Sequence, residues 1–317
     1  MTDLALPVTY ADIRAARERI RPHVRRTPVM SVEAGALGPA AVTFKLEHLQ
    51  HAGSFKARGA FNNLLSREVP GAGVTAVSGG NHGIAVALAA RRLGHPATIF
   101  VPEISPPVKL AAIRAQGAEV VVSPRFAEAL EACQRHASGT GALFVHPFDM
   151  PETLAGQGTV ALEWQEDHAR MGIAPLDTVL VAVGGGGLAA GMAAWFAGRT
   201  RVVGVEPEGC RSLHAALEAG QPVEVEVRSV AADSLGAPRA GDLVFAVASQ
   251  AMAGVVLVRD EDIVAAQQRL WRDWRIAVEP GGATALAALT GGAYRAQPGE
   301  RVGVLLCGAN VDPATLA

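Results

Sequence analysis

The chain contains very little lysine. Its 28 basic residues include only three lysines, Lys45, Lys56 and Lys109, and all the others are arginines. Arginine keeps its charge and cannot act as an amine nucleophile, whereas a desolvated lysine can lose its proton and attack a carbonyl carbon. Any chemistry that needs a side-chain amine therefore has three candidates in this sequence.

Several other features are scarce as well. The chain has 3 cysteines, none in CxxC spacing, which argues against a disulfide framework or a structural zinc site. A net charge of −2 argues against nucleic acid or an anionic membrane as the main partner. No apolar run is long enough to span a membrane, and the first residues lack the apolar core of a signal peptide. These absences predict a cytoplasmic protein.

Two of the lysines lie in segments that predict exposed side chains. Lys45 belongs to the alternating run 42–46, which is typical of a strand with one solvated face. Lys109 follows two prolines and lies at the start of the amphipathic helix expected at 108–116, so its first turn should face water. Neither setting would turn the amine into a nucleophile.

Lys56 has different neighbours. Gly53 and Ser54 predict a turn and a helix N-cap, and residues 57–65 predict the helix that follows. The positive end of a helix dipole disfavours the ammonium form and suits a phosphate or carboxylate nearby. We therefore expect the chemistry in the stretch 51–60, although local sequence alone favours an ordinary surface lysine.

Strand-like apolar runs alternate with helical runs along the 317 residues, which are enough for two domains. The alternation occupies 74–146 and repeats on a larger scale over 154–306, whereas 223–247 shows little periodicity and predicts a loop with a helix near its end. Short connections between such elements predict the α/β class, with open twisted parallel sheets. Ligand chemistry is expected in the cleft between the two sheets.

Two glycine-rich loops each follow a predicted strand and open a helix. The first contains Ser78, Gly79, Gly80, Asn81 and His82, and its backbone N–H groups can point at an anion. A tight strand-to-helix turn is the structural alternative for this loop, and a histidine there is more often structural than catalytic. The second loop suits an oxyanion such as phosphate at a helix N-terminus. It consists of Gly184, Gly185, Gly186, Gly187 and Leu188.

The second loop also satisfies a loose dinucleotide-binding fingerprint. Gly184, Gly186 and Ala189 have the required spacing, and Glu206 ends the next predicted strand about 20 residues further on. A nicotinamide-dependent oxidoreductase is therefore a second hypothesis. It gives no role to the loops around Lys56 and Asn81, and glycine-rich α/β chains often meet the fingerprint by chance.

Three further residues could contribute to a site: Glu279, Asp233 and Cys307. Glu279 precedes another glycine-rich helix entry, 280–283, and Asp233 lies in the weakly patterned stretch, where it could cap a helix. Cys307 follows the last predicted strand and should lie at the carboxyl edge of its sheet, where ligands bind. The commoner fate of a free cysteine is to be a small buried hydrophobe.

Taken together, these motifs resemble the fold-type II pyridoxal-phosphate enzymes, and most closely the threonine/serine dehydratase branch that includes the serine racemases. The matching segments keep the family's order over nearly the whole chain: GSFKARGA (53–60), SGGNHG (78–83), AGQGT (155–159), GGGGL (184–188), EPGGA (279–283) and CGAN (307–310). The resemblance implies a tryptophan synthase β-like fold. Its large cofactor-binding domain would comprise 1–72 and 147–317, and its small α/β domain 73–146.

The same resemblance assigns roles around the reacting amine. Lys56 would carry pyridoxal 5′-phosphate covalently and later move the Cα proton of the substrate. Phe55 would pack near the cofactor ring, and Asn81 would hold the ring hydroxyl. The loop 78–82 would bind the carboxylate of a small amino-acid substrate.

It also assigns the far side of the cofactor. The backbone of 184–188 would bind the phosphate, Cys307 would lie beside the pyridine nitrogen, and Glu279 would line the same site. A neutral thiol at that nitrogen would favour quick loss of a β-hydroxyl over a long-lived carbanion. We therefore expect a homodimeric dehydratase that converts L-threonine and/or L-serine into 2-oxobutanoate or pyruvate plus ammonia.

Two positions depart from the family pattern. In the racemases of this branch a serine stands two residues before the loop asparagine and transfers protons, whereas this chain has Gly79 there, which disfavours racemisation. Many relatives bind a divalent metal through the glutamate matching Glu206 and an aspartate six residues on, where this chain has Ser212, so we expect no metal. Racemisation and β-elimination from 3-hydroxyaspartate or diaminopropionate remain alternatives, because the motifs do not fix the amino acid.

Overall fold

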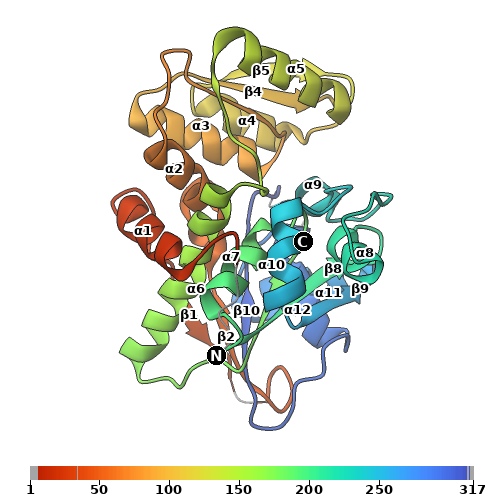
Figure 1. Cartoon of the computed structure of the whole chain (residues 1–317). Coiled ribbons are helices and arrows are strands. Elements are labelled where there is room, and N and C mark those ends of the chain that lie inside the picture. Colours follow the sequence, from red (N-terminus) through yellow and green to blue (C-terminus); the bar gives the residue numbers. More distant parts are fainter. Residues whose placement is uncertain (1–5, 34, 313, 315–317) are drawn as a thin grey trace.

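The computed structural model describes residues 6–33, 35–312 and 314, which form two separate sheets surrounded by helices (Figure 1). The strands are β1 (Val29–Ser31), β2 (Ala41–Lys45), β3 (Val74–Val77), β4 (Ala97–Pro102), β5 (Glu119–Ser123), β6 (Leu143–Phe144), β7 (Thr178–Ala182), β8 (Arg201–Pro207), β9 (Gly254–Val258) and β10 (Arg301–Leu305).

The helices of the described residues are α1 (Tyr10–Ile20), α2 (Lys56–Ser66), α3 (Asn81–Leu93), α4 (Pro107–Ala115), α5 (Phe126–Thr140), α6 (Pro151–Met171), α7 (Gly187–Phe196), α8 (Ser212–Ala219), α9 (Ala232–Leu235), α10 (Asp242–Ala251), α11 (Asp260–Trp274) and α12 (Pro280–Thr290). Two short 3-10 turns, η1 (Glu47–Leu49) and η2 (His51–Gly53), connect β2 to α2.

The larger sheet has the strand order β1-β2-β10-β7-β8-β9, and all its pairs are parallel except β1 with β2. The chain runs outward from β7 to β9 and then returns to β10 on the other side of β7. Right-handed crossovers therefore put α11 and α12 on the face opposite α7. The order reverses between β7 and β10, and in open α/β sheets ligands bind beyond the carboxyl ends of the strands at such a point.

The smaller sheet repeats this logic with the order β5-β4-β3-β6, all parallel. The chain moves from β3 out to β5 and returns to β6 on the far side of β3. The reversal therefore lies between β3 and β6. The loops that leave these strands, 78–80 and 145–150, meet at that point, and both turn toward the larger sheet (Figure 1).

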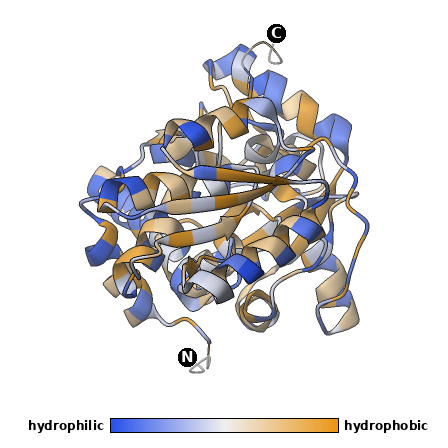
Figure 2. Ribbon diagram, turned by 90° about the horizontal axis from the view of Figure 1, so that it is seen from above, coloured by the Kyte–Doolittle hydropathy of each residue, from blue (hydrophilic) through white to orange (hydrophobic). Residues whose placement is uncertain are grey.

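Each sheet has its own apolar core. The larger core is built around β7, β8 and β10 with α7 and α12, and the smaller one around β3 and β4 with α3. Figure 2 shows the apolar strands in the middle of the molecule, with polar residues on the outer faces of the helices. Helix α2 joins the two units, since Ala57, Phe61 and Leu64 belong to the smaller core while the helix also packs on α6.

The predicted fold class is confirmed, including the parallel sheets and the alternation of strands and helices. The prediction missed the antiparallel edge strand β1 and the two 3-10 turns. In the weakly periodic stretch 223–247 the chain forms the short α9 and, as expected, a helix near the end, α10. The domain limits at 72 and 147 stay a prediction, and their outer ends, 1–5, 313 and 315–317, lie outside the described residues.

Among the residues that the structure describes, no helix combines the length and the apolar character needed to cross a membrane.

Candidate active site

Lys56 begins α2, but Ser54 does not cap this helix. The N-cap position is Phe55, with no side-chain cap bond, so the predicted Ser54 cap is wrong. Ser54 is extended and forms a β-bridge with Gly308, and the Phe55 N–H donates to the carbonyl of Cys307 at 3.1 Å. Pairing with the segment after β10 fixes the entry to α2 and brings Lys56 to the carboxyl edge of the larger sheet.

The Lys56 amine lies between the two sheets. Its Nζ donates to the carbonyl of Pro147 at 2.7 Å and lies 5.2 Å from the centre of the Phe55 ring. Pro147 belongs to the connection that returns from the small sheet to the large one. Burial lowers the pKa of this amine to about 8, while Cys307 acts weakly in the opposite direction. Lys56 is thus a lysine that can be neutral near physiological pH.

Cys307 follows β10 and is buried at the carboxyl end of the sheet, as predicted. Its Sγ donates to the carbonyl of Gly281 at 3.5 Å. Burial raises the pKa of the thiol to about 12, and Glu279 adds to the rise. The thiol is therefore neutral, and the hydrogen bond from the Phe55 N–H to the Cys307 carbonyl brings Cys307 close to Lys56.

The glycine loop after β7 has no room for side chains. A Cβ on Gly185 or Gly187 would lie within 3.0 Å of Phe148, and one on Gly184 would meet the backbone of Leu235 at 2.9 Å. Gly186 has φ of +86°, a conformation that glycine adopts without strain, and Leu188 is buried in the first turn of α7. The free N–H groups at this helix N-terminus form a cradle suited to an anion.

The loop after β3 brings Asn81 and His82 to the same place. The Asn81 side chain donates to Glu279 and accepts from Asn310 at 2.7 Å. The His82 Nε2 contacts the carbonyl of Val145 at 2.9 Å, and burial lowers the pKa of this imidazole to about 3, with a contribution from Lys56. Ser78 Oγ accepts from the Gly80 N–H at 3.2 Å and so tightens the turn.

Gly79 faces Ser105, a residue that sequence reasoning missed. An added Cβ at Gly79 would lie 1.7 Å from Ser105 Oγ and 2.4 Å from Ser105 Cβ. The Ser105 hydroxyl, held by its hydrogen bond to the Pro102 carbonyl at 2.6 Å, therefore occupies the space that a side chain at position 79 would need. The packing of the loop therefore leaves no room for a side chain at Gly79, the position where the family resemblance implies a serine in the racemases.

This packing predicts the outcome of a paired substitution. Gly79→Ser alone should lower the free energy of unfolding by about 1–3 kcal/mol, because it overfills the loop. Adding Ser105→Gly should recover most of that loss. Chemical unfolding of the two variants tests this, with Gly139→Ser as control, because nothing lies within 4 Å of a Cβ at Gly139. Equal stability of the single and double variants would contradict the prediction.

The environment of Glu206 argues against nicotinamide binding. The carboxylate is fully buried and accepts from the backbone N–H groups of Leu213 at 2.9 Å and His214 at 2.8 Å. Burial raises its pKa to about 8. A carboxylate that caps α8 in this way is not free to bind ribose hydroxyls. Ser212 donates to the Gly184 carbonyl at 3.2 Å, and no metal-ligating cluster occurs among the described residues.

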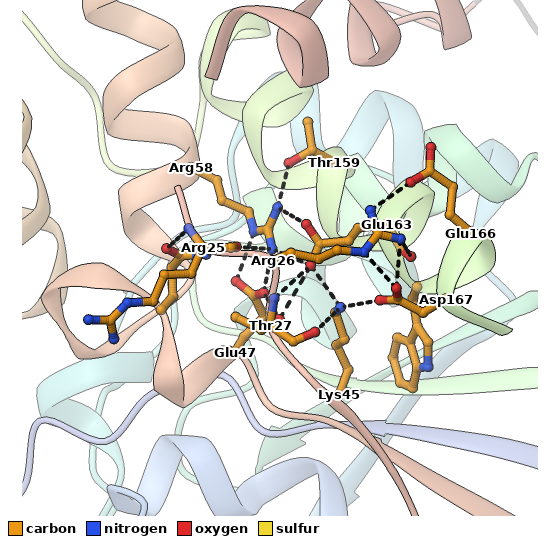
Figure 3. Close-up of polar contacts among 12 residues, drawn as sticks. Arg25, Arg26, Thr27, Lys45, Glu47, Arg58, Thr159, Glu163, Glu166 and Asp167 are labelled. Carbon is orange, nitrogen blue, oxygen red and sulfur yellow. Dashed lines mark hydrogen bonds and ion pairs between the residues drawn. The ribbon is translucent and has the colours of Figure 1, made fainter. Parts of the chain in front are cut away.

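Lys45 is not solvated, contrary to the prediction. It is 0% exposed, and its Nζ contacts Glu163 at 2.8 Å and Asp167 at 2.9 Å. Figure 3 shows that this pair belongs to a larger buried network. There Arg58, two residues after Lys56, binds Glu47 through two nitrogens and also contacts Glu163 at 3.0 Å. The network anchors the first turn of α2 and so holds Lys56 in place.

Lys109 is also buried, contrary to the prediction. It is 1% exposed and contacts Glu279 at 2.7 Å and Asp233 at 2.8 Å, so Asp233 pairs with a lysine and does not cap a helix. Burial opposes charging of Lys109, but the two carboxylates outweigh it and raise its pKa. The three lysines therefore differ in their partners. Lys45 and Lys109 each contact two carboxylates, whereas Lys56 contacts a backbone carbonyl.

Besides Ser105, the sequence did not reveal the roles of four groups at this site: the Pro147 carbonyl, Phe148, Lys109 and Asn310 as a partner of Asn81. Asn310 belongs to the CGAN motif (307–310), but its contact with Asn81 depends on the three-dimensional fold. The segment 146–149 carried a usable signal. It lies between a predicted strand and a predicted helix, where the carboxyl end of a strand meets a ligand.

Known proteins resemble this chain in both sequence and fold. A family model described as pyridoxal-phosphate dependent enzyme matches residues 20–308. Phenylserine dehydratase from Ralstonia pickettii is 42% identical over 311 residues, covering 96% of this chain and 94% of that protein. The crystal structure of a T.th. threonine deaminase superposes with a TM-score of 0.89 at 38% identity, covering 96% and 99% of the two chains. Maize serine racemase gives 0.91 at 34% identity, covering 98% and 95%.

The chain therefore belongs to the family of pyridoxal-phosphate-dependent enzymes. Within it, the chain has the fold of the threonine deaminases and serine racemases, the branch that the sequence motifs indicated, and its cofactor is pyridoxal phosphate.

The residues of the site fit this cofactor. The Lys56 amine has a depressed pKa, as an amine that must attack an aldehyde requires. The cradle of 184–187 is lined so closely that only glycine fits, and its N–H groups suit a phosphate. Ser54 Oγ, two residues before Lys56, is buried without a hydrogen-bond partner in the part of the chain that the structure describes, and it is available to a ligand.

The depressed pKa predicts when the cofactor attaches. The covalent uptake of pyridoxal phosphate by cofactor-free protein should rise with pH around pH 8, where the neutral amine appears, and not around the ordinary lysine value of 10.5. Stopped-flow absorbance of the protein–cofactor adduct, followed from neutral to alkaline pH, measures this rate. A rate that keeps rising beyond pH 10 would show that the amine titrates as an exposed lysine.

Proposed function

We propose that the chain is an ammonia-lyase that eliminates the β-hydroxyl of L-threonine and/or L-serine, giving 2-oxobutanoate or pyruvate plus ammonia. The observation that carries this proposal is the buried, uncharged thiol of Cys307 just after β10, held close to Lys56 because the Cys307 carbonyl accepts the Phe55 N–H. Pyridoxal phosphate supplies an electron sink when bound, and the group at its ring nitrogen tunes that sink.

Cys307 would be that group. A thiol with a pKa of about 12 carries no charge, so it cannot stabilise a positive ring nitrogen as a carboxylate would. Negative charge at the substrate Cα is then stabilised only briefly, which favours prompt departure of a β-leaving group. This chemistry suits elimination better than transamination.

Lys56 would hold and move the proton at the substrate Cα. Its amine contacts no carboxylate of the described residues and lies in a buried setting that lowers its pKa to about 8, close to the working pH at which a general base is most effective. The start of α3 would bind the substrate carboxylate, because the N–H groups of 79–82 lie at a helix N-terminus. The His82 imidazole stays neutral there, so the substrate carboxylate would be the charged group at this helix start.

A β-aryl substrate is the strongest alternative. Phenylserine dehydratase shows 42% identity over almost the whole chain, and its name denotes the same elimination on a larger hydroxy-amino acid. Elimination from 3-hydroxyaspartate or diaminopropionate would use the same Lys56 chemistry. Racemisation is disfavoured because Gly79 offers no proton-transferring side chain and Ser105 fills its space. We also expect a homodimer, as the family resemblance implies, and the cytoplasmic location that the composition predicts.

A substrate panel tests the proposal. Purified protein loaded with pyridoxal phosphate should release 2-oxo acid and ammonia in equal amounts from L-threonine or L-serine. The panel also contains L-threo-phenylserine, L-threo-3-hydroxyaspartate and 2,3-diaminopropionate, each assayed for D-amino acid as well. A clear preference for one of these three would replace the proposed substrate, and accumulation of D-serine at a rate comparable to pyruvate would overturn the interpretation of Gly79.

A further inference from the structure

One buried ammonium group joins the two sheet units directly. Lys109 lies on α4, beside the smaller sheet, and both of its carboxylate partners come from the other unit. Glu279 precedes α12 and contacts its Nζ at 2.7 Å, while Asp233 lies on α9 and contacts it at 2.8 Å. Lys109 and Glu279 are each 1% exposed, so this contact is sealed from water.

The contact continues from Lys109 toward the reacting amine. The second oxygen of Glu279 accepts from the Asn81 side chain, whose own oxygen accepts from Asn310 at 2.7 Å. The Asn310 amide also donates to the carbonyl of Ala52 at 2.8 Å, in the turn that precedes Lys56. An unbroken chain of polar contacts thus runs from α4 through Asn81 to the loop that carries Lys56, and it crosses between the two units three times.

The charges of this chain of contacts leave little freedom. One ammonium group faces two carboxylates, and Glu279 is wholly enclosed, since a Cβ at Gly308 would lie 2.1 Å from its Oε1. Burial raises the pKa of Glu279, and Lys109 opposes the rise without cancelling it. Without Lys109 this carboxylate would have no cation beside it, and its cheapest response would be to bind a proton or turn away.

Either response would disturb Asn81. The amide of Asn81 donates to a carboxylate oxygen, and a protonated or rotated Glu279 would no longer hold it in the same orientation. The packing around Gly80 reinforces the link, because a Cβ at Gly80 would lie 3.2 Å from the Asp233 carbonyl and 3.9 Å from the Lys109 side chain. The substrate loop is thus packed against the ion pair as well as bonded to it.

We propose that Lys109 is a positioning residue of the active site: it holds the smaller unit closed against α9 and α12 and, through Glu279, fixes the orientation of Asn81. This role of Lys109 rests on the proposed function, because Asn81 needs a fixed orientation only if it binds the cofactor. Lys109 itself touches neither substrate nor cofactor in this account.

The test compares Lys109→Met, which keeps the length of the side chain and removes its charge, with Lys109→Arg, which restores a cation. Arg114→Met is the matched control, because it removes one positive charge from an exposed position on the same helix. Hydrogen–deuterium exchange of peptides covering 78–84 is measured in the cofactor-free and the loaded protein. The kinetic constants for 2-oxo acid release and the absorption spectrum of the bound cofactor are recorded in parallel.

Lys109→Met should raise the exchange of 78–84 in both forms, shift the absorption spectrum and lower kcat/KM by about ten- to a hundredfold, the usual effect of losing a charge-assisted hydrogen bond. Lys109→Arg should restore the exchange rate and part of the activity, and Arg114→Met should match the unsubstituted protein. If Lys109→Met lowers only the thermal midpoint, with exchange, spectrum and kcat/KM within about twofold of the unsubstituted protein, the proposal is wrong. If no substrate is turned over by the unsubstituted protein, the function fails, while exchange still decides the role of Lys109.

Discussion

Replacing Lys56 by alanine is expected to abolish 2-oxo acid release, with a fall in kcat of at least about 1,000-fold. The amine would provide both the covalent anchor of the cofactor and the transfer of the Cα proton, and a single acid–base group alone contributes about 10²–10⁴-fold. Lys45 and Lys109 cannot replace it, since each is bound to two carboxylates. The measurement is ammonia and keto-acid release, together with loss of the absorption band of the covalently bound cofactor.

Lys56→Arg is the matched control for this experiment. It keeps a cation at the start of α2 but offers no amine nucleophile, so it should be as inactive as the alanine variant. Borohydride reduction of the unsubstituted protein should attach the cofactor to the peptide that contains Lys56. Label on the peptides of Lys45 or Lys109, or turnover above about a tenth of normal in Lys56→Ala, would remove Lys56 from the mechanism.

Arg58→Leu is expected to lower the free energy of unfolding by about 3–5 kcal/mol, the usual cost of breaking a buried ion pair by removing one partner. The guanidinium is 0% exposed and bridges Glu47 and Glu163, so its loss leaves two buried carboxylates without this partner, and Lys45 remains paired with Glu163 alone of the two (Figure 3). Those two carboxylates hold the pKa of Arg58 well above its usual range despite burial. Denaturant unfolding of the cofactor-free protein measures the loss.

The control is a pair at the surface. Arg125 is 81% exposed beside Glu128, and an exposed pair of this kind contributes about 0–1 kcal/mol. Arg125→Leu should therefore leave the unfolding midpoint nearly unchanged. Similar losses in the two variants would mean that the buried network of α2, β2 and α6 does not carry the stability assigned to it.

The sequence predicted the fold, because the fold leaves local signals, whereas Lys56 as the reactive amine stays a prediction that its buried setting supports. Alternating strands and helices indicate a parallel sheet, and glycine loops at strand ends indicate where the sheet binds ligands. The segments around Lys56, Asn81 and Cys307 each follow such an end, or a turn beside it, and the structure brings them together at one edge of the larger sheet.

The settings of Lys45 and Lys109 could not be predicted in this way. Each lies in a segment whose periodicity is typical of a solvated face, and the carboxylates that allow their burial are more than a hundred positions away, Glu163 for the first and Glu279 for the second. A buried charge depends on a distant partner, which a local pattern does not reveal. The antiparallel strand β1 escaped notice for a similar reason, since three residues of an edge strand carry no period of their own.

The segment that follows β10 determines when the active site can assemble during synthesis of the chain. The carbonyl of Cys307 receives the Phe55 N–H, and the carbonyl of Gly308 receives that of Glu279. Ribosomes build chains from the amino end, so 307–310 are the last of these residues to be made. A nascent chain that already contains the amine and the phosphate cradle still lacks the piece that joins them. The site therefore assembles only late in synthesis, after the smaller sheet has had time to form and together with β10, the strand that joins β2 to β7 in the larger sheet.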